Sequence, residues 1–365
     1  MADGRVRSRR STLGAQQTVG VPPGPGSVVV VVGRGALAAA MAAWFSRPSP
    51  TGEPAWTVRS VEEVLPVDPQ EVLTGAAVVV LALHDADFAA FSGIPAAGRR
   101  AAGVAHTQRV LAAARAVGAR HVVVISSAMV HGATAGQSVL TDDAALITAD
   151  DVGLVGDLLA VEAVVARFRR RRTPLVTVLR PAALVGAGVD TMITRHFEAP
   201  RLLAVRGTVR EWQFVHVDDV ASAAEHAVRH GLAGALTVGA ADVLSPTQVE
   251  TASGLHRIEL AAVTAFATAE RLHRVGVLPA PASELAYTVY PWTVASDRLR
   301  ASGWEPAWSS AACLEVLLDN GSGRIAVAGR RVGPRDAAAL GAAGAAVAFL
   351  GTAAIWRQAR VRRRG

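Results

Sequence analysis

A glycine-rich segment near the N-terminus has the residue types and spacing of a phosphate-binding turn. Residues 33–38 read GRGALA and directly follow five consecutive valines, Val28–Val32. In the pattern G-x-G-x-x-G/A, two glycines allow a tight turn and close approach to a pyrophosphate, and a small third residue lets the helix pack on the strand. The helix N-terminus then faces the anion. The pattern predicts a dinucleotide site at Gly33, Gly35 and Ala38; a tight turn without a ligand is the alternative.

Three further residues are candidates for contacting the cofactor. No Asp or Glu clearly ends the second predicted strand, where an acidic residue would hold the ribose of NAD. Arg59 lies there instead; it could meet the 2′-phosphate of NADP or be a solvated surface residue. Asp68 could lie near the adenine, or it could cap a helix. Leu83 ends a strand on the expected nicotinamide side. The sequence therefore predicts NAD or NADP without deciding between them.

The elements that must position these residues alternate along the chain. Helices are predicted at Gly103–Val117 and Leu154–Phe168, and apolar strands at Val28–Val32, Trp56–Val61, Val64–Val67, Ala77–Leu83, His121–Ser126 and Leu175–Leu179. This alternation favours an α/β fold with a doubly wound parallel sheet, the Rossmann architecture. After Arg180 the pattern loosens, with helical stretches at Asp219–Arg229 and Thr247–Ala269. Residues 182–320 therefore predict a smaller C-terminal substrate-side lobe.

Charge divides the chain into a body and two basic ends. The net charge is +7, but residues 1–27 carry +3 and residues 321–365 carry +8, which leaves −4 for the body. This acidic body disfavours nucleic acid as a partner. We expect four segments: a disordered basic arm at 1–27, a folded body at 28–320, a linker at 321–335 and an apolar helix with a basic tail at 336–365.

Four segments of the body carry a family resemblance. They are residues 109–118, His121–Gly132, Leu179–Ala182 with Gly186, and Gln213–Ala221. In this order they resemble a helix, two strands and a later conserved box of the extended short-chain dehydrogenase/reductase superfamily, in its NAD-dependent epimerase/dehydratase group. The resemblance covers about residues 28–320. It implies a Rossmann domain that binds a dinucleotide, with a nucleotide sugar or sterol-like molecule as the substrate.

The active site implied by this resemblance is degenerate. The family uses a Ser that holds the reacting oxygen, a Tyr acid/base and a Lys that lowers the pKa of the Tyr. Ser127 matches the Ser, but the Tyr is expected at Val152–Leu154 and the Lys near Asp157 or Leu158. The chain contains no lysine, and its two tyrosines are Tyr287 and Tyr290. A phenol with a pKa near 10 needs such a cationic neighbour for acid/base work at neutral pH.

His131 is the candidate replacement for the missing acid/base, because imidazole titrates near neutral pH. A packing role in the place of a non-catalytic Tyr is the alternative. Arg167 and the run of arginines at 169–172 end a helix, where a solvated helix terminus is favoured over an anion site. The His and Asp residues show no spacing typical of a metal site.

The C-terminal region contains an uncharged apolar run at residues 337–356, half of it alanine, followed by five arginines. Twenty residues can span a bilayer, so membrane association is predicted, with a soluble packed helix as the alternative.

The only cysteine is Cys313. A single thiol is compatible with a reducing cytoplasm, so we expect a cytoplasmic protein, anchored at the membrane if the run inserts.

Two functions follow as hypotheses. The absence of both Tyr and Lys favours a dinucleotide-binding module that senses redox state or binds a partner. The alternative is a non-canonical NAD(P)-dependent oxidoreductase or epimerase in which Ser127 and His131 act on a nucleotide sugar or sterol-like substrate. Whether the chain is an enzyme is left open by the sequence.

Overall fold

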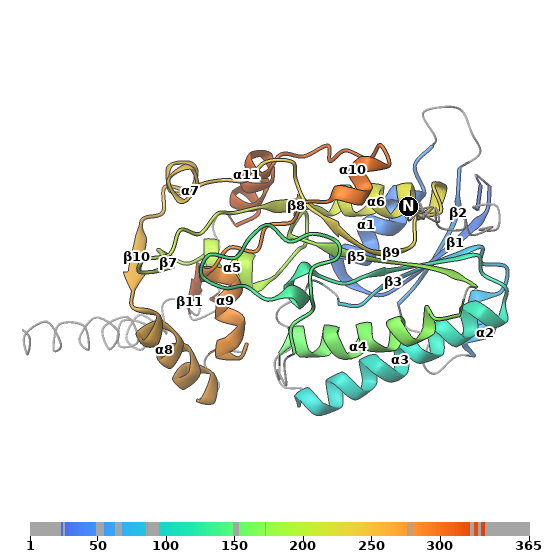
Figure 1. Cartoon of the computed structure of the whole chain (residues 1–365), viewed down its shortest axis with the longest axis horizontal. Helices are drawn as coiled ribbons and strands as arrows, with labels where there is room; N and C mark the ends of the chain where they lie inside the picture. Colours follow the sequence, from blue (N-terminus) through green and yellow to red (C-terminus); the bar gives the residue numbers. More distant parts are fainter. Residues whose placement is uncertain are drawn as a thin grey trace, which may run out of the picture.

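The computed structural model describes residues 23–332 apart from short gaps at 25, 49–54, 63–67, 85, 87–94, 149–152, 172, 276–277, 279, 322–324 and 328–329. Its centre is a six-stranded parallel sheet of order β2-β1-β3-β4-β5-β9. The strands are β1 (Val28–Val32), β2 (Thr57–Val61), β3 (Val78–Ala82), β4 (His121–Ile125), β5 (Leu175–Pro181) and β9 (Gly234–Val238). The predicted α/β doubly wound sheet is confirmed (Figure 1).

The valine-rich strands form this sheet because they are covered on both faces. β3 and β4 are buried along their whole length, and four of the five valines of β1 are buried. Continuous apolar runs are typical of parallel strands in such a position. The edge strand β2 carries exposed polar residues, among them Arg59.

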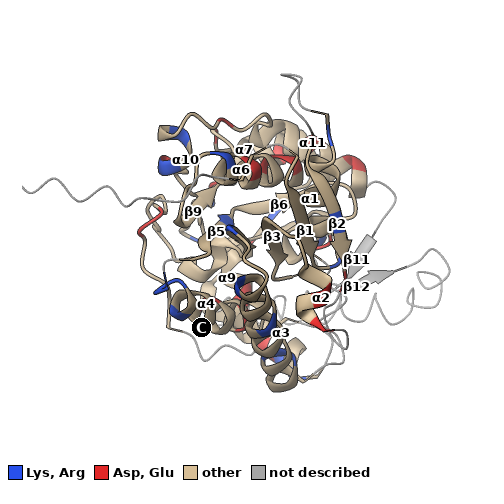
Figure 2. Cartoon of the chain, turned by 90° about the vertical axis from the view of Figure 1, so that its right-hand side faces the viewer, with Lys and Arg blue, Asp and Glu red and all other residues tan. Residues whose placement is uncertain are grey.

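Helices cover the two faces of the sheet. α1 (Gly35–Phe45) packs against α6 (Val217–Arg229) on one face, and α3 (Ala96–Ala116) packs against α4 (Leu154–Phe168) on the other, together with α2 (Pro69–Leu73). Figure 2 shows these layers, with the strands between the two sets of helices. Two large apolar clusters fill the spaces between sheet and helices. The helix predicted at Gly103–Val117 starts earlier, at Ala96.

The second lobe is built from short elements that follow β5. β6 (Ala183–Val185) pairs with β8 (Phe214–His216), and β7 (Leu202–Val205) pairs with β10 (Arg257–Leu260). The helices of this part are α5 (Met192–Phe197), α7 (Pro246–Ser253), α8 (Ala262–Arg274), η3 (Ala282–Leu285), α9 (Ala286–Val289), α10 (Asp297–Ala301) and α11 (Ser310–Gly321). Most of them lie beyond one end of the main sheet, whereas α10 lies beside β9 (Figure 1).

The single helix predicted at Thr247–Ala269 is wrong. The chain forms α7, then β10, then α8 over this stretch. Gly254 ends α7 in the left-handed conformation, at φ +67°, and the next residues pair with β7. A glycine at this position is a common helix stop. Pairing with a distant strand then overrides the local helical pattern.

Some predicted segments lie outside the described residues. These are the strand at Val64–Val67, most of the basic arm, and the apolar run at 337–356. Within the predicted linker, β11 (Ile325–Val327) and β12 (Arg330–Val332) form a small antiparallel pair. Over the part of the chain that is described, no helix has both the length and the apolar character required to cross a membrane.

Candidate dinucleotide site and the adjoining degenerate centre

The glycine turn lies between the end of β1 and the start of α1, as predicted. Gly33 has a φ of +145° and Gly35 a φ of +75°, values that favour glycine. A Cβ added to Gly33 would come within 2.9 Å of the Cβ of Ala82, at the end of β3. Ala38 is buried between helix and sheet. The small residues are therefore required by close packing and by backbone conformation at this turn.

The N-terminus of α1 fits an anionic group. Its N-cap, Arg34, makes no side-chain capping hydrogen bond, and the first turn contains no acidic residue. Gly35 is exposed, so the first backbone N–H groups of the helix are not covered by a side chain of that residue. Uncapped N–H groups and the helix dipole both favour a phosphate here. The turn has the geometry that a pyrophosphate requires.

The other three candidate cofactor residues have structural contacts. Arg59 is exposed on β2 and donates to the carbonyl oxygen of Thr74. Asp68 is the N-cap of α2 and accepts a hydrogen bond of 3.0 Å from the N–H of Gln70, which is the alternative considered for it. The N–H of Leu83 donates to a carbonyl of the neighbouring strand. Cofactor contacts of these residues stay predictions.

Ser127 and His131 both follow β4. Ser127 directly precedes the 3-10 helix η2 (Ala128–His131), and His131 is its last residue. Ser127 is the N-cap, and its Oγ accepts a hydrogen bond of 3.2 Å from the N–H of Met129. Both candidate catalytic side chains are buried, with exposed fractions of 7% for Ser127 and 5% for His131. The structure brings them into one short segment, as the sequence predicts.

A buried ion pair lies directly beside His131. The carboxylate of Glu162, on α4, accepts hydrogen bonds from Arg180 of β5, with an Nη2–Oε2 distance of 2.6 Å, and from the hydroxyl of Ser126. Nη1 of Arg180 lies 3.3 Å from Nε2 of His131, and Nδ1 of His131 lies 3.0 Å from the carbonyl oxygen of Ala145. Strand, helix and loop are therefore joined by one polar network.

This network fixes the protonation of His131. A guanidinium only donates, so Nε2 accepts and Nδ1 carries the proton that it donates to the carbonyl of Ala145. Burial lowers the pKa of His131, and the positive charge of Arg180 acts in the same direction. Both ring nitrogens are thus engaged by protein groups in a neutral imidazole. The geometry gives His131 a packing and hydrogen-bonding role, and a catalytic role stays a prediction.

The start of α4 is where the resemblance places the family's Tyr and Lys. Gly153 is the N-cap, and a Cβ added to it would overlap Oε1 of Glu284. Glu284 belongs to η3 of the second lobe, is 3% exposed, and accepts a hydrogen bond of 3.4 Å from the N–H of Val155. Asp157, at the Lys position, pairs with Arg99 and Arg100 of α3. A carboxylate and an ion pair thus occupy this place.

Tyr287 was not a candidate from sequence, yet it reaches the same centre. Its hydroxyl donates a hydrogen bond of 2.7 Å to the carbonyl oxygen of Met129, although the two residues are 158 positions apart. Met129 also donates its N–H to Ser127. No local pattern signals this contact, because it depends on packing of the second lobe against η2.

Among the described residues no group of His, Cys, Asp and Glu could hold a metal ion.

The parallel sheet with a glycine turn after its first strand defines a Rossmann-type protein. Residues 76–239 match the sequence model of the NAD dependent epimerase/dehydratase family, which confirms the resemblance predicted from the motifs. An uncharacterized protein of Mycobacterium tuberculosis is 26% identical over 228 residues, which are 62% of this chain and 61% of the relative. The chain thus spans less than two thirds of the length of this curated relative.

Solved structures share the fold at low sequence identity. MoeE5 in complex with UDP-glucose and NAD is similar with a TM-score of 0.56 and 20% identity, over 81% of this chain and 98% of MoeE5. UDP-N-acetylglucosamine 4-epimerase from Bacillus cereus has a TM-score of 0.54 and 14% identity, over 81% and 100%. RMD from Pseudomonas aeruginosa, complexed with NADPH, has a TM-score of 0.57 and 17% identity, over 81% and 98%. These likenesses establish the architecture.

Proposed function

We propose that the chain binds NAD or NADP at the turn Gly33–Ala38 and acts as a dinucleotide-binding sensor or partner-binding module. The family match supports dinucleotide binding, as do the fold neighbours in complex with NAD or NADPH. The uncapped start of α1 supports the same position for the pyrophosphate. When bound, the nicotinamide would supply hydride chemistry, and the question is whether this chain can manage the accompanying proton.

The contact between Glu284 and Gly153 carries the non-catalytic part of this proposal. General acid/base work at a carbinol needs a group that can hold a proton near the reacting oxygen. The family resemblance expects a Tyr at Val152–Leu154, none of these residues is a Tyr, and the side-chain space of Gly153 is taken by Glu284 and Pro281. Where it expects a Lys, Asp157 is paired with Arg99 and Arg100. The absence of a Tyr at these positions, the absence of lysine from the chain and the filled space beside Gly153 together support a non-catalytic role.

Tyr287 supports a second candidate, an oxidoreductase or epimerase with altered catalytic groups. Its hydroxyl donates to the carbonyl oxygen of Met129, and the N–H of Met129 donates to Ser127. The phenol and the serine therefore share one backbone neighbour. A nucleotide sugar would be the first substrate class to test, because MoeE5 was solved with UDP-glucose and NAD. In this alternative Ser127 and Tyr287 would act together, with His131 buried behind them.

The proposal is tested by calorimetric titration of the full chain with NAD, NADH, NADP and NADPH. We expect saturable binding of at least one of the four. Gly35→Asp should abolish it by placing a negative charge against the pyrophosphate. Gly75→Asp is the control matched for backbone conformation, since Gly75 has a similar φ of +76°. Gly75 precedes β3 and so lies at the opposite end of the strands from the glycine turn. Failure of the wild-type chain to bind any of the four contradicts the proposal.

A further inference from the structure

A cavity between α3 and α4 is not part of the dinucleotide site. Its volume is about 290 Å³. Four of its lining residues belong to α3, and the other four belong to α4 or directly follow it: Gln108, Leu111, Ala112, Arg115, Val164, Arg167, Phe168 and Arg171. α3 leads into β4 and α4 leads into β5. The C-terminal ends of both helices therefore lie at the end of the sheet where the strands begin. The glycine turn follows the C-terminal end of β1 and therefore lies at the opposite end of the sheet, where the strands finish.

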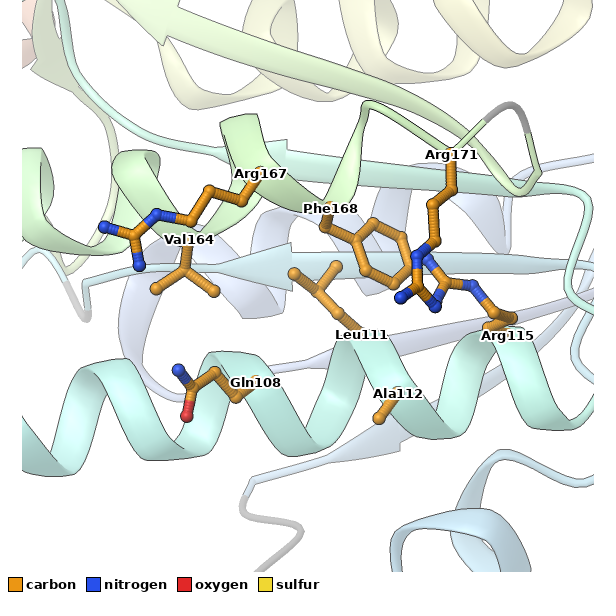
Figure 3. A pocket seen from close by; sticks show the side chains of 8 residues that line it. All are labelled: Gln108, Leu111, Ala112, Arg115, Val164, Arg167, Phe168 and Arg171. Atoms are coloured by element: carbon orange, nitrogen blue, oxygen red, sulfur yellow. The ribbon is translucent and has the colours of Figure 1, made fainter.

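The lining is cationic above an apolar floor. Three of the eight residues are arginines and none is acidic, while Leu111, Ala112 and Val164 supply apolar surface. Figure 3 shows the guanidinium groups of Arg115 and Arg171 next to each other beside the ring of Phe168. Figure 2 shows the positions of basic residues, in blue, along the ribbons of both helices. Two adjacent like charges repel each other unless an anion lies between or beside them.

Arg115 gives the strongest indication of a missing ligand. Its Nε and Nη2 are buried and have no hydrogen-bond partner. The guanidinium stacks on Phe168, with 4.1 Å from Cζ to the ring centroid, which occupies one face of the group and leaves its N–H edge to be satisfied. Buried donors without partners are rare in folded proteins. The solvated helix terminus expected from the sequence concerns Arg167 and the run at 169–172, of which Arg167 and Arg171 are exposed, whereas Arg115 lies on the neighbouring helix α3.

We propose that this cavity binds a small organic anion, with its carboxylate, sulfonate or phosphate on Arg115 and Arg171 and its apolar part on Leu111 and Val164. Guanidinium groups bind these oxyanions by paired, charge-assisted hydrogen bonds. The volume is close to the lower limit for small-molecule sites, so the ligand is about the size of a substituted aromatic ring system. The proposal is independent of the dinucleotide function.

The test uses the full chain and naphthalene-1-sulfonate as the probe, in isothermal titration calorimetry. We expect one saturable site. Arg115→Gln and Arg171→Gln should each weaken binding about tenfold, the value of one charge-assisted hydrogen bond. Arg170→Gln is the matched control, because Arg170 is exposed, adjacent in sequence and outside the lining. Its affinity should stay within about twofold of the wild type. The Gly35→Asp variant should bind the probe normally.

Three results would overturn this assignment. The first is absence of saturable binding at millimolar probe. The second is equal weakening by Arg170→Gln and Arg171→Gln, which would mean general charge attraction. The third is equal affinity for the uncharged 1-naphthalenemethanol, which would mean an apolar groove without an anion site. Since Arg115 packs on Phe168, the exposed Arg171 keeps the test valid if Arg115→Gln impairs folding.

Discussion

The carboxylate of Glu284 occupies the space that a side chain of Gly153 would need at the N-terminus of α4. This contact joins the second lobe to the helix on which the family resemblance places its Tyr. Gly153 has a φ of −95°, so its backbone would accept another residue, and the side chains of Glu284 and Pro281 exclude one. A glycine here is explained by Glu284 and Pro281 rather than by chain conformation.

A double-mutant cycle measures this contact. We expect Gly153→Ala to destabilise the wild-type protein by about 1–3 kcal/mol, the usual effect of overpacking. In the Glu284→Ala background the same change should have a smaller effect, because the carboxylate is gone and only Pro281 still crowds the added methyl group. Denaturant unfolding of the four proteins gives the interaction energy. Equal effects in both backgrounds would show that Glu284 does not fill this space.

The buried pair Glu162–Arg180 should be far more sensitive to mutation than a surface pair. Glu162→Gln leaves the positive charge of Arg180 buried without its partner, for an expected loss of about 3–5 kcal/mol. The control is Glu270→Gln, whose partner Arg274 has 71% of its side chain exposed. That change should have an effect below about 0.5 kcal/mol. Similar losses for the two variants would argue against a closed network around His131.

His121 should make the fold acid-sensitive. Its Nε2 lies 2.8 Å from Oγ1 of Thr177, and burial lowers its pKa from 6.5 to about 4. Because the folded-state pKa is depressed, stability is fully present above pH 6.5 and falls as the pH drops from 6.5 toward 4, by up to about 3 kcal/mol. His121→Asn should reduce this pH dependence in unfolding experiments, and a part should stay because burial also lowers the pKa of His196, to about 3. An unchanged slope would mean that other groups cause it.

The apolar run at 337–356 lies outside the described residues, and its prediction is tested by deletion. Removing residues 336–365 should move the protein from the membrane fraction to the soluble fraction, because the run supplies the apolar surface for insertion. The thermal unfolding midpoint of the body should not change. Full-length protein that is soluble without detergent would instead support a helix that does not enter the membrane.

Much of the fold could be predicted from the sequence because its strands are unusually apolar. Val28–Val32 and the strand beginning at His121 are continuous apolar runs; the first is followed directly by α1, and the second is preceded by α3. The second lobe could not be predicted in the same way. β10 is a strand because it pairs with β7, more than fifty residues earlier, and this partner leaves no local pattern.

The candidate site was only partly predictable for the same reason. The glycine turn and the position of Ser127 are local features, and the structure places both where the spacing indicates. Glu284 and Tyr287 come from a distant segment and reach η2 and α4 only through packing of the lobes. The hydrogen-bond partners of His131 likewise come from β5 and a loop, so its neutral, fully bonded state could not be predicted from its neighbours in sequence.

The proposed function is tested most directly by turnover of the bound dinucleotide. The measurement is reduced-cofactor absorbance across a panel of nucleotide sugars and hydroxysteroids at several pH values, with protein that has first been shown to bind the cofactor. We expect no conversion above the protein-free rate, since neither a Tyr at Val152–Leu154 nor a Lys at Asp157 or Leu158 is present in the sequence. Turnover at about 1 s⁻¹ or faster, an ordinary enzymatic rate, would contradict a non-catalytic module. Loss of that turnover in Tyr287→Phe or His131→Ala would then identify the group that replaces the missing tyrosine.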